Sequence, residues 1–92
     1  MKLRPGQLMQ VNSERTSVDC DIMYGMLSGE LSTDAAVAME NFNGPNVNAG
    51  DYVLILSNAI LDRRLGNAGY GVYWVEVLLG DRRVIISAKG LL

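Results

Sequence analysis

The fold is decided by residues 72–87, which read VYWVEVLLGDRRVIIS. β-branched and aromatic residues dominate both halves of this stretch, as is typical of strands, and Gly80-Asp81 separates the halves. Glycine at the first central position of a two-residue turn suits type II′ geometry, whose twist matches that of a hairpin. The stretch therefore predicts a β-hairpin with strands 72–79 and 83–87.

The turn sets the register of this hairpin. Val77 then faces Val84 and Val75 faces Ile86, so one face is apolar, as a core face should be. A slip by one residue would mix the two faces, so the pattern and the turn agree. The outermost pairs of the same face are Leu79 with Arg82 and Tyr73 with Ala88. The opposite face carries Trp74, Glu76 and Leu78 across from Ser87, Ile85 and Arg83.

Three further stretches predict strands. Residues 51–58 are apolar on both faces, which indicates a central and largely buried strand. Residues 17–24 alternate, with apolar side chains on one face and Asp19 and Asp21 on the other. A shorter strand is expected at residues 7–12. The chain therefore reads as mainly β with five strands.

The segment between the second and third strands has a different pattern. Residues 31–42 place most apolar side chains at helical spacing, which favours a short helix. A strand at 35–41 is the competing interpretation, because Val37 lies off the helical stripe. Residues 43–50 and 59–71 are rich in asparagine and glycine, and we expect loops there.

Composition limits the possible functions. The 92 residues are 49% hydrophobic and 20% charged with a net charge of −2, which predicts a single compact domain spanning 1–92. The sequence has no histidine, which excludes an imidazole base, a Ser-His-Asp triad and histidine metal ligands. With Cys20 as the single cysteine, an intrachain disulfide and a zinc finger are excluded as well. We therefore expect no enzymatic activity, no catalytic residues, no metal and no cofactor.

Compartment signals are equally limited. Lys2 and Arg4 are not followed by an apolar run, so no secretory signal is expected. The longest apolar stretches, 53–56 and 77–79, are far shorter than the ~20 residues that a membrane-spanning helix needs. Cys20 lies between two aspartates, which raise the pKa of its thiol and favour a small core residue. These features predict the reducing interior of a cell or a virion assembled there.

Two polar motifs have structural explanations that we favour. Residues 66–71, GNAGYG, resemble a phosphate-binding loop, but such a loop needs a preceding strand and a following helix. Here a loop precedes and a strand follows, so we expect a connection. Asp19 and Asp21, about 7 Å apart on a strand, could contribute to a calcium site. No calcium-loop pattern accompanies them, which favours a solvated polar face.

The outer face of the hairpin is the strongest candidate for function. Monomeric proteins seldom expose such a mixture of large apolar and charged side chains, so this face is either covered by residues 25–48 or forms a protein–protein interface. The candidate interface residues are Trp74, Glu76, Leu78, Arg83 and Ile85.

Arginine pairs offer an alternative function. Arg63, Arg64, Arg82 and Arg83 are candidate phosphate contacts, and the aromatic side chains could stack on bases in a small nucleic-acid-binding β-barrel. Neighbouring aspartates and the net negative charge weaken this hypothesis. A protein partner or a second copy of the chain is therefore the preferred partner, with no membrane and no small-molecule substrate expected.

The order of these elements resembles the small Src-homology-three-like barrels, and in particular short proteins of this kind encoded by tailed phages. The similarity lies in the opening RPGQLMQV at 4–11, GDYVLIL at 50–56, YWVEVLL at 73–79 and the closing ISAKGL at 86–91. It implies a five-stranded barrel with a short helix or structured loop after the second strand, closed by a one-turn helix. An oligonucleotide-binding-type barrel is the topological alternative.

The resemblance also implies a role in binding or assembly. The expected function is that of a non-enzymatic structural or protein-interaction module, for example a virion neck, tail or capsid-surface component that forms a homo-oligomer or binds another protein. The groove aromatics of the peptide-binding barrels are mostly absent, so proline-rich ligands are not expected. No functional residue is carried over from the family to a position in this chain.

Overall fold

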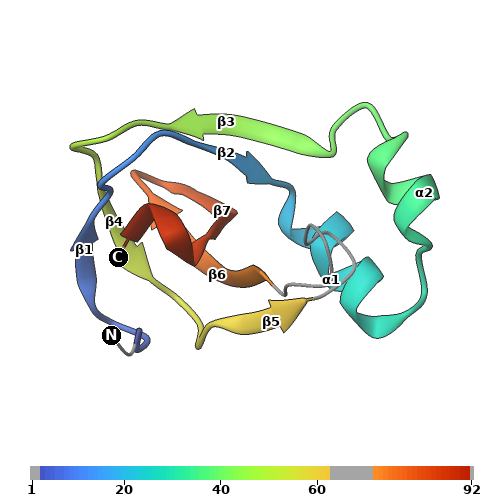
Figure 1. Cartoon of the computed structure of the whole chain (residues 1–92), viewed down its shortest axis with the longest axis horizontal. Helices are drawn as coiled ribbons and strands as arrows, with labels where there is room; N and C mark the ends of the chain where they lie inside the picture. Colours follow the sequence, from blue (N-terminus) through green and yellow to red (C-terminus); the bar gives the residue numbers. More distant parts are fainter. Residues whose placement is uncertain (1–2, 63–71, 92) are drawn as a thin grey trace.

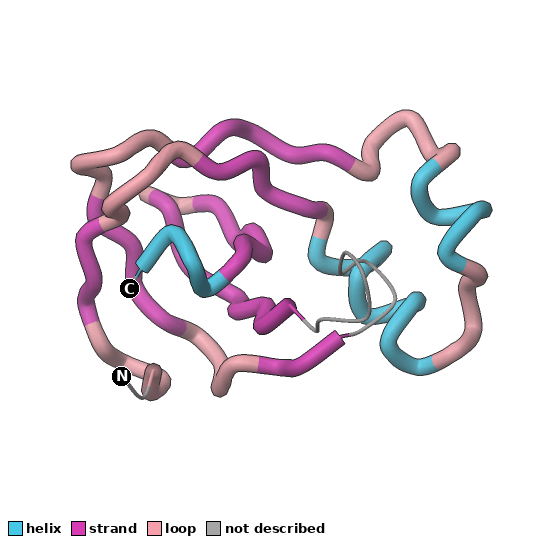
Figure 2. Tube along the Cα trace, viewed as in Figure 1, coloured by secondary structure: helices cyan, strands magenta, loops and turns pink. Residues whose placement is uncertain are grey.

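The chain folds mainly as β-sheet (Figures 1 and 2). The computed structural model describes residues 3–62 and 72–91, and its described strands form one antiparallel sheet. The elements are β1 (Leu8–Gln10), β2 (Arg15–Val18), α1 (Cys20–Ser28), α2 (Thr33–Val37), β3 (Asn43–Val47), β4 (Tyr52–Ile55), β5 (Ile60–Asp62), β6 (Val72–Leu79), β7 (Arg82–Ser87) and the 3₁₀-helix η1 (Ala88–Leu91).

The described sheet contains seven strands where the pattern predicted five. Its order is β1-β4-β6-β7-β2-β3. β5 lies off this path and pairs with the start of β6, from Val72 to Trp74. One extra strand arises because the predicted strand 51–58 ends at Ile55 and the chain pairs with β6 again at Ile60. The hydrogen-bonded path from β1 to β3 does not close, so the closed barrel is not confirmed among these strands. The sheet is nevertheless curved, because Val47 of β3 and Val53 of β4 share one core.

The hairpin of β6 and β7 has the predicted register. Val75 pairs with Ile86 and Val77 with Val84. On the opposite face the expected pairs also form: Trp74 with Ser87, Glu76 with Ile85, and Leu78 with Arg83. Gly80 has φ 63°, a left-handed conformation that glycine adopts without steric cost. The expected outermost pair with Tyr73 is not formed, because β7 ends at Ser87 and the next residue begins η1. η1 stands where the resemblance implied a closing one-turn helix.

The predicted strand at 17–24 is wrong beyond Val18. Asp19 caps a helix instead: its side chain accepts a hydrogen bond from the backbone N–H of Ile22 at 3.0 Å. The helix α1 ends at Ser28 and is capped by Gly29, whose φ is 83°. Alternation and helical spacing both fit this short apolar segment, and the N-cap together with burial of Met26 favours the helix. The two aspartates therefore belong to a helix start and not to the polar face of a strand.

The middle segment also differs from expectation. The helix expected at 31–42 is present as the shorter α2, capped by Ser32, and the competing strand is wrong. The predicted loop at 43–50 instead contains β3, which pairs with β2. A Cβ on Gly44 would lie 2.5 Å from Ser17 Oγ, so glycine permits this close pairing. Ser17 Oγ donates to the carbonyl oxygen of Pro45 at 2.6 Å and adds a hydrogen bond between the strands.

Two hydrophobic cores lie on opposite faces of the hairpin. The inner core is enclosed by the curved sheet and η1, and the second core lies between the hairpin and the two helices. The buried members of the inner core are Leu3, Val11, Val47, Val53, Ile55, Val75, Val77, Val84, Ile86, Ala88 and Leu91. Those of the second core are Val18, Ile22, Met23, Met26, Ala36 and Ile85, with Cys20 packed against them.

Candidate functional site on the outer face of the sheet

The outer face of the sheet is organised in rows that cross the strands. Register pairs place Leu8 opposite Leu54, Leu54 opposite Leu78, and Leu78 opposite Arg83. This row therefore crosses β1, β4, β6 and β7 in a straight line. We call its apolar members Leu8, Leu54 and Leu78 the leucine row.

Helix α1 covers the part of this face nearest the second core. Ile85 is 2% exposed and Trp74 is partly buried, and both pack in the second core with the methionines of α1. Residues of the middle segment thus cover this half of the candidate interface. Leu78 and Arg83 lie at its uncovered side, where Leu78 is partly exposed.

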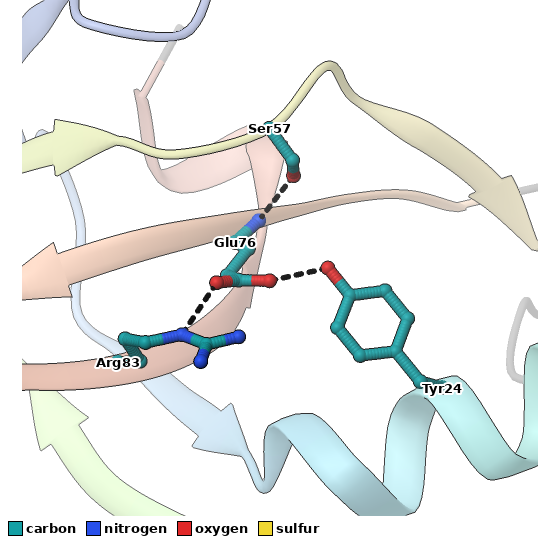
Figure 3. A network of polar contacts seen from close by, with 4 residues as sticks. All are labelled: Tyr24, Ser57, Glu76 and Arg83. Carbon is teal, nitrogen blue, oxygen red and sulfur yellow. Dashed lines mark hydrogen bonds and ion pairs between the residues drawn. The ribbon is translucent and has the colours of Figure 1, made fainter.

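A polar network connects α1 to the sheet (Figure 3). Glu76 is 7% exposed, and its Oε2 accepts a hydrogen bond of 2.7 Å from Arg83 Nε. The Tyr24 hydroxyl, reaching up from α1, donates to Glu76 Oε1, and the backbone N–H of Glu76 donates to Ser57 Oγ at 3.2 Å. Both carboxylate oxygens of a buried acid are therefore satisfied, as burial requires.

The network sets the protonation of its members. Burial alone would raise the pKa of Glu76, but the hydrogen bonds from Arg83 and Tyr24 and the charge of Arg83 outweigh it and lower this pKa. Burial, followed by the hydrogen bond to Glu76, raises the pKa of Tyr24 to about 12. At neutral pH the carboxylate is ionised and the phenol protonated. Neither group is poised for proton transfer near neutrality, so the geometry serves docking of α1 better than acid–base chemistry.

Cys20 lies at the edge of the same network. Burial, with the negative charge of Glu76 next in importance, raises the pKa of its thiol. A raised pKa reduces the thiolate fraction, which is the reactive form. Cys20 accordingly serves as a packing residue of the second core.

The outer face carries exposed side chains at its β1 end, whereas Leu54 and Leu78 are partly exposed. Leu8 is 64% exposed, and Tyr52, which lies on β4 opposite Gln10, is 61% exposed. The Arg83 side chain at the end of the row is 62% exposed although its Nε is held by Glu76. Sequence reasoning identified Leu78 and Arg83 but missed Leu8, Leu54 and Tyr52, because only the order of strands in the sheet brings β1 and β4 beside β6.

The other candidate residues do not gather here. Arg82 pairs with Leu79 and so points to the face opposite that of Arg83. Arg63, Arg64 and the glycine-rich stretch 66–71 lie outside the described residues. Over residues 3–62 and 72–91, no group of three or more Cys, Asp or Glu side chains is arranged to hold a metal ion. Within the same ranges, none of the helices has the length and apolar character needed to cross a membrane.

Comparison with known proteins adds no relative. No protein-family model matches the chain, and no curated protein and no solved structure matches it.

Proposed function

We propose that this protein is a non-enzymatic structural or interaction module that binds another protein through the leucine row. The observation that carries the proposal is the row itself: three leucines from three strands, aligned across the sheet and left uncovered by α1. A scattered exposed leucine is ordinary on a protein surface, but an aligned and adjacent set is typical of a contact surface.

Arg83 gives the surface a polar end. Its Nε is bound to Glu76, so the guanidinium is held beside Leu78, and its terminal nitrogens make no hydrogen bond to the residues that the structure describes. A partner that fits would present apolar side chains to the leucine row and a carboxylate to these nitrogens, because guanidinium and carboxylate form strong paired hydrogen bonds. An aromatic anchor, Tyr52, borders the row and adds contact area.

The absence of histidine from the sequence and the structural use of Glu76 and Tyr24 support the non-enzymatic part of the proposal. The resemblance to small barrels of tailed phages supports a role within a virion, where the partner is another component of the particle. Nucleic acid binding is less well supported, because Arg82 and Arg83 lie on opposite faces of β7 and so do not form one phosphate-binding surface.

Site-specific photo-crosslinking tests this function. A photoreactive residue at position 78 should yield a discrete protein adduct when the protein is expressed with its natural partners. The same residue at Val37, which is 51% exposed on α2, should yield none and serves as the control. Leu54→Asp should abolish the adduct at position 78 without unfolding the chain. Equal labelling at positions 78 and 37, or no adduct at 78, would contradict the proposal.

A further inference from the structure

The two ends of the hydrogen-bonded strand path are not equally protected. β1 and β3 are the terminal strands of the hydrogen-bonded path. β3 contains Pro45, which has no N–H to offer a neighbouring strand, and proline is a common means of blocking an edge. β1 contains no proline. Along residues 5–13, which include β1, the sequence also has no charged side chain, so the lysines that commonly guard an edge are absent.

The backbone groups of β1 that point away from β4 can be identified from the pairing of the two strands. Ile55 N–H donates to the Gln7 carbonyl at 2.9 Å, and Val11 N–H donates to the Asp51 carbonyl at 2.8 Å. Residues 7 and 11 therefore face β4, and alternation assigns Met9 to the same side. The N–H and C=O groups of Leu8 and Gln10 point away from β4, toward the edge that pairs with no strand among residues 3–62 and 72–91.

A turn fixes the backbone at the start of β1. Gln7 N–H donates to the Arg4 carbonyl at 3.2 Å across Pro5 and Gly6, and Gly6 has φ 86°, the features of a type II turn. Gly6 N–H also donates to the Ile55 carbonyl at 2.8 Å. The open edge is thus held in strand conformation before any partner arrives, which lowers the entropy cost of pairing.

We propose that β1 pairs antiparallel with β1 of a second copy, so that the two sheets join into one continuous sheet. The register places Leu8 opposite Gln10 of the second copy and Met9 opposite the equivalent methionine on the two-fold axis. Each pair of Leu8 and Gln10 then exchanges two backbone hydrogen bonds, which satisfies all the outward groups of both strands. The neutral sequence of the strand means that no like charges oppose each other when identical copies meet.

Self-pairing goes beyond the proposed function, since it uses the edge of the sheet and leaves the faces of Leu54 and Leu78 open. The two-fold axis runs perpendicular to the joined sheet, so both leucine rows lie on the same side and form one longer apolar surface. The contact is small because β1 has three residues. We therefore expect a weak dimer, as for contacts below the standard interface size.

Sedimentation equilibrium over a concentration series measures this association. The wild-type chain should approach twice the monomer mass near 1 mM, and Leu8→Pro should weaken the dimer at least tenfold. Proline at position 8 removes an N–H that points outward and leaves pairing with β4 intact. Two lysine variants on the end strands separate an effect at β1 from a general effect of adding a charge. Gln10→Lys on β1 should weaken the dimer, whereas Asn43→Lys on β3 should not. A wild-type chain that remains monomeric, or equal weakening by the two lysines, would overturn the proposal.

Disulfide trapping tests the register. In a Cys20→Ala background, Met9→Cys should form a covalent dimer on oxidation, because directly opposed residues that are not hydrogen-bonded bring their Cα atoms to about 4.5 Å. Leu8→Cys should not, since it faces Gln10 of the second copy. The reverse result would overturn the register. A monomer that still crosslinks through position 78 would defeat self-pairing and leave the proposed function standing.

Discussion

The two faces of the β6–β7 hairpin are packed by different means. On the inner face, Val75, Val77 and Ile86 are fully buried among side chains of the sheet and η1. On the outer face, Ile85 packs against methionines of α1, and beside it the buried Glu76 is held by a hydroxyl of that same helix. The inner core is enclosed mainly by the strands that form the sheet, whereas the second core exists only while α1 is docked.

This difference predicts two levels of stability. Loss of the inner core removes the packing between strands and should unfold the whole chain. Loss of the second core removes contacts of one helix and its polar network, so the sheet should retain part of its protection. Local stability of this kind is accessible to hydrogen exchange.

The largest effect is expected from Ile86→Ala. This side chain is fully buried in the inner core, and truncation of a buried isoleucine leaves a cavity that costs about 4 kcal/mol. Urea denaturation followed by circular dichroism should show the helical and sheet signals lost together. A loss below about 1 kcal/mol would mean that the inner core is not the main source of stability.

The next largest effect is expected from Met23→Ala in α1. Met23 is fully buried in the second core, and its truncation should cost about 3 kcal/mol. Amide hydrogen exchange should show α1 losing more protection than β6 and β7. Met39→Ala, at a side chain that is 42% exposed, is the control and should change stability by less than about 0.5 kcal/mol. Equal loss of protection in helix and sheet would show that the two cores unfold as one unit.

A smaller effect is expected from Tyr24→Phe. The substitution leaves Glu76 Oε1 without its donor while preserving the ring in the second core. The loss of a hydrogen bond to a buried carboxylate should cost about 1.5 kcal/mol in the free energy of unfolding. Tyr52→Phe, at an exposed ring, should have almost no effect in the same thermal or urea measurement. A cost as low as that of the control would show that the network does not stabilise the docking of α1.

A further effect is the pH dependence that this network adds. The folded pKa of Tyr24 is raised from 10.0 to about 12, so its contribution to stability is complete below pH 10 and is lost as the pH rises toward 12. The pKa of Glu76 is lowered in the folded state, so its contribution is present above its ordinary value of 4.5 and is lost as the pH falls. The free energy of unfolding measured against pH should therefore decline less steeply at alkaline pH in Tyr24→Phe. Identical alkaline slopes in both proteins would contradict the raised pKa.

Local signals allowed part of this fold to be predicted. The hairpin followed from residues 72–87, because a two-residue turn and an alternating pattern specify the same register. The segment 17–24 was misassigned because a short apolar run fits both periods, and the cap at Asp19 determined the outcome. β3 was missed because its asparagine, glycine and proline are loop residues by composition, and pairing with β2 overrides that composition.

The candidate site was predictable only where it lies on the hairpin. Leu78 and Arg83 are neighbours through the hairpin register, so the pattern identified both. Leu8 and Leu54 come from β1 and β4, which are distant in sequence, and no local signal indicates that they align with Leu78. A row across strands requires the order of the sheet, which depends on long-range contacts.

By itself, the sequence determined which side chains of the hairpin share a face, because successive side chains of a strand point to opposite sides. It also determined that both faces are apolar enough to need a covering. Only the tertiary structure decided what covers each face: the curved sheet encloses the inner one, and α1 covers half of the outer one. The period of a strand is a local property, whereas the choice of covering depends on how distant segments bury the most apolar surface together.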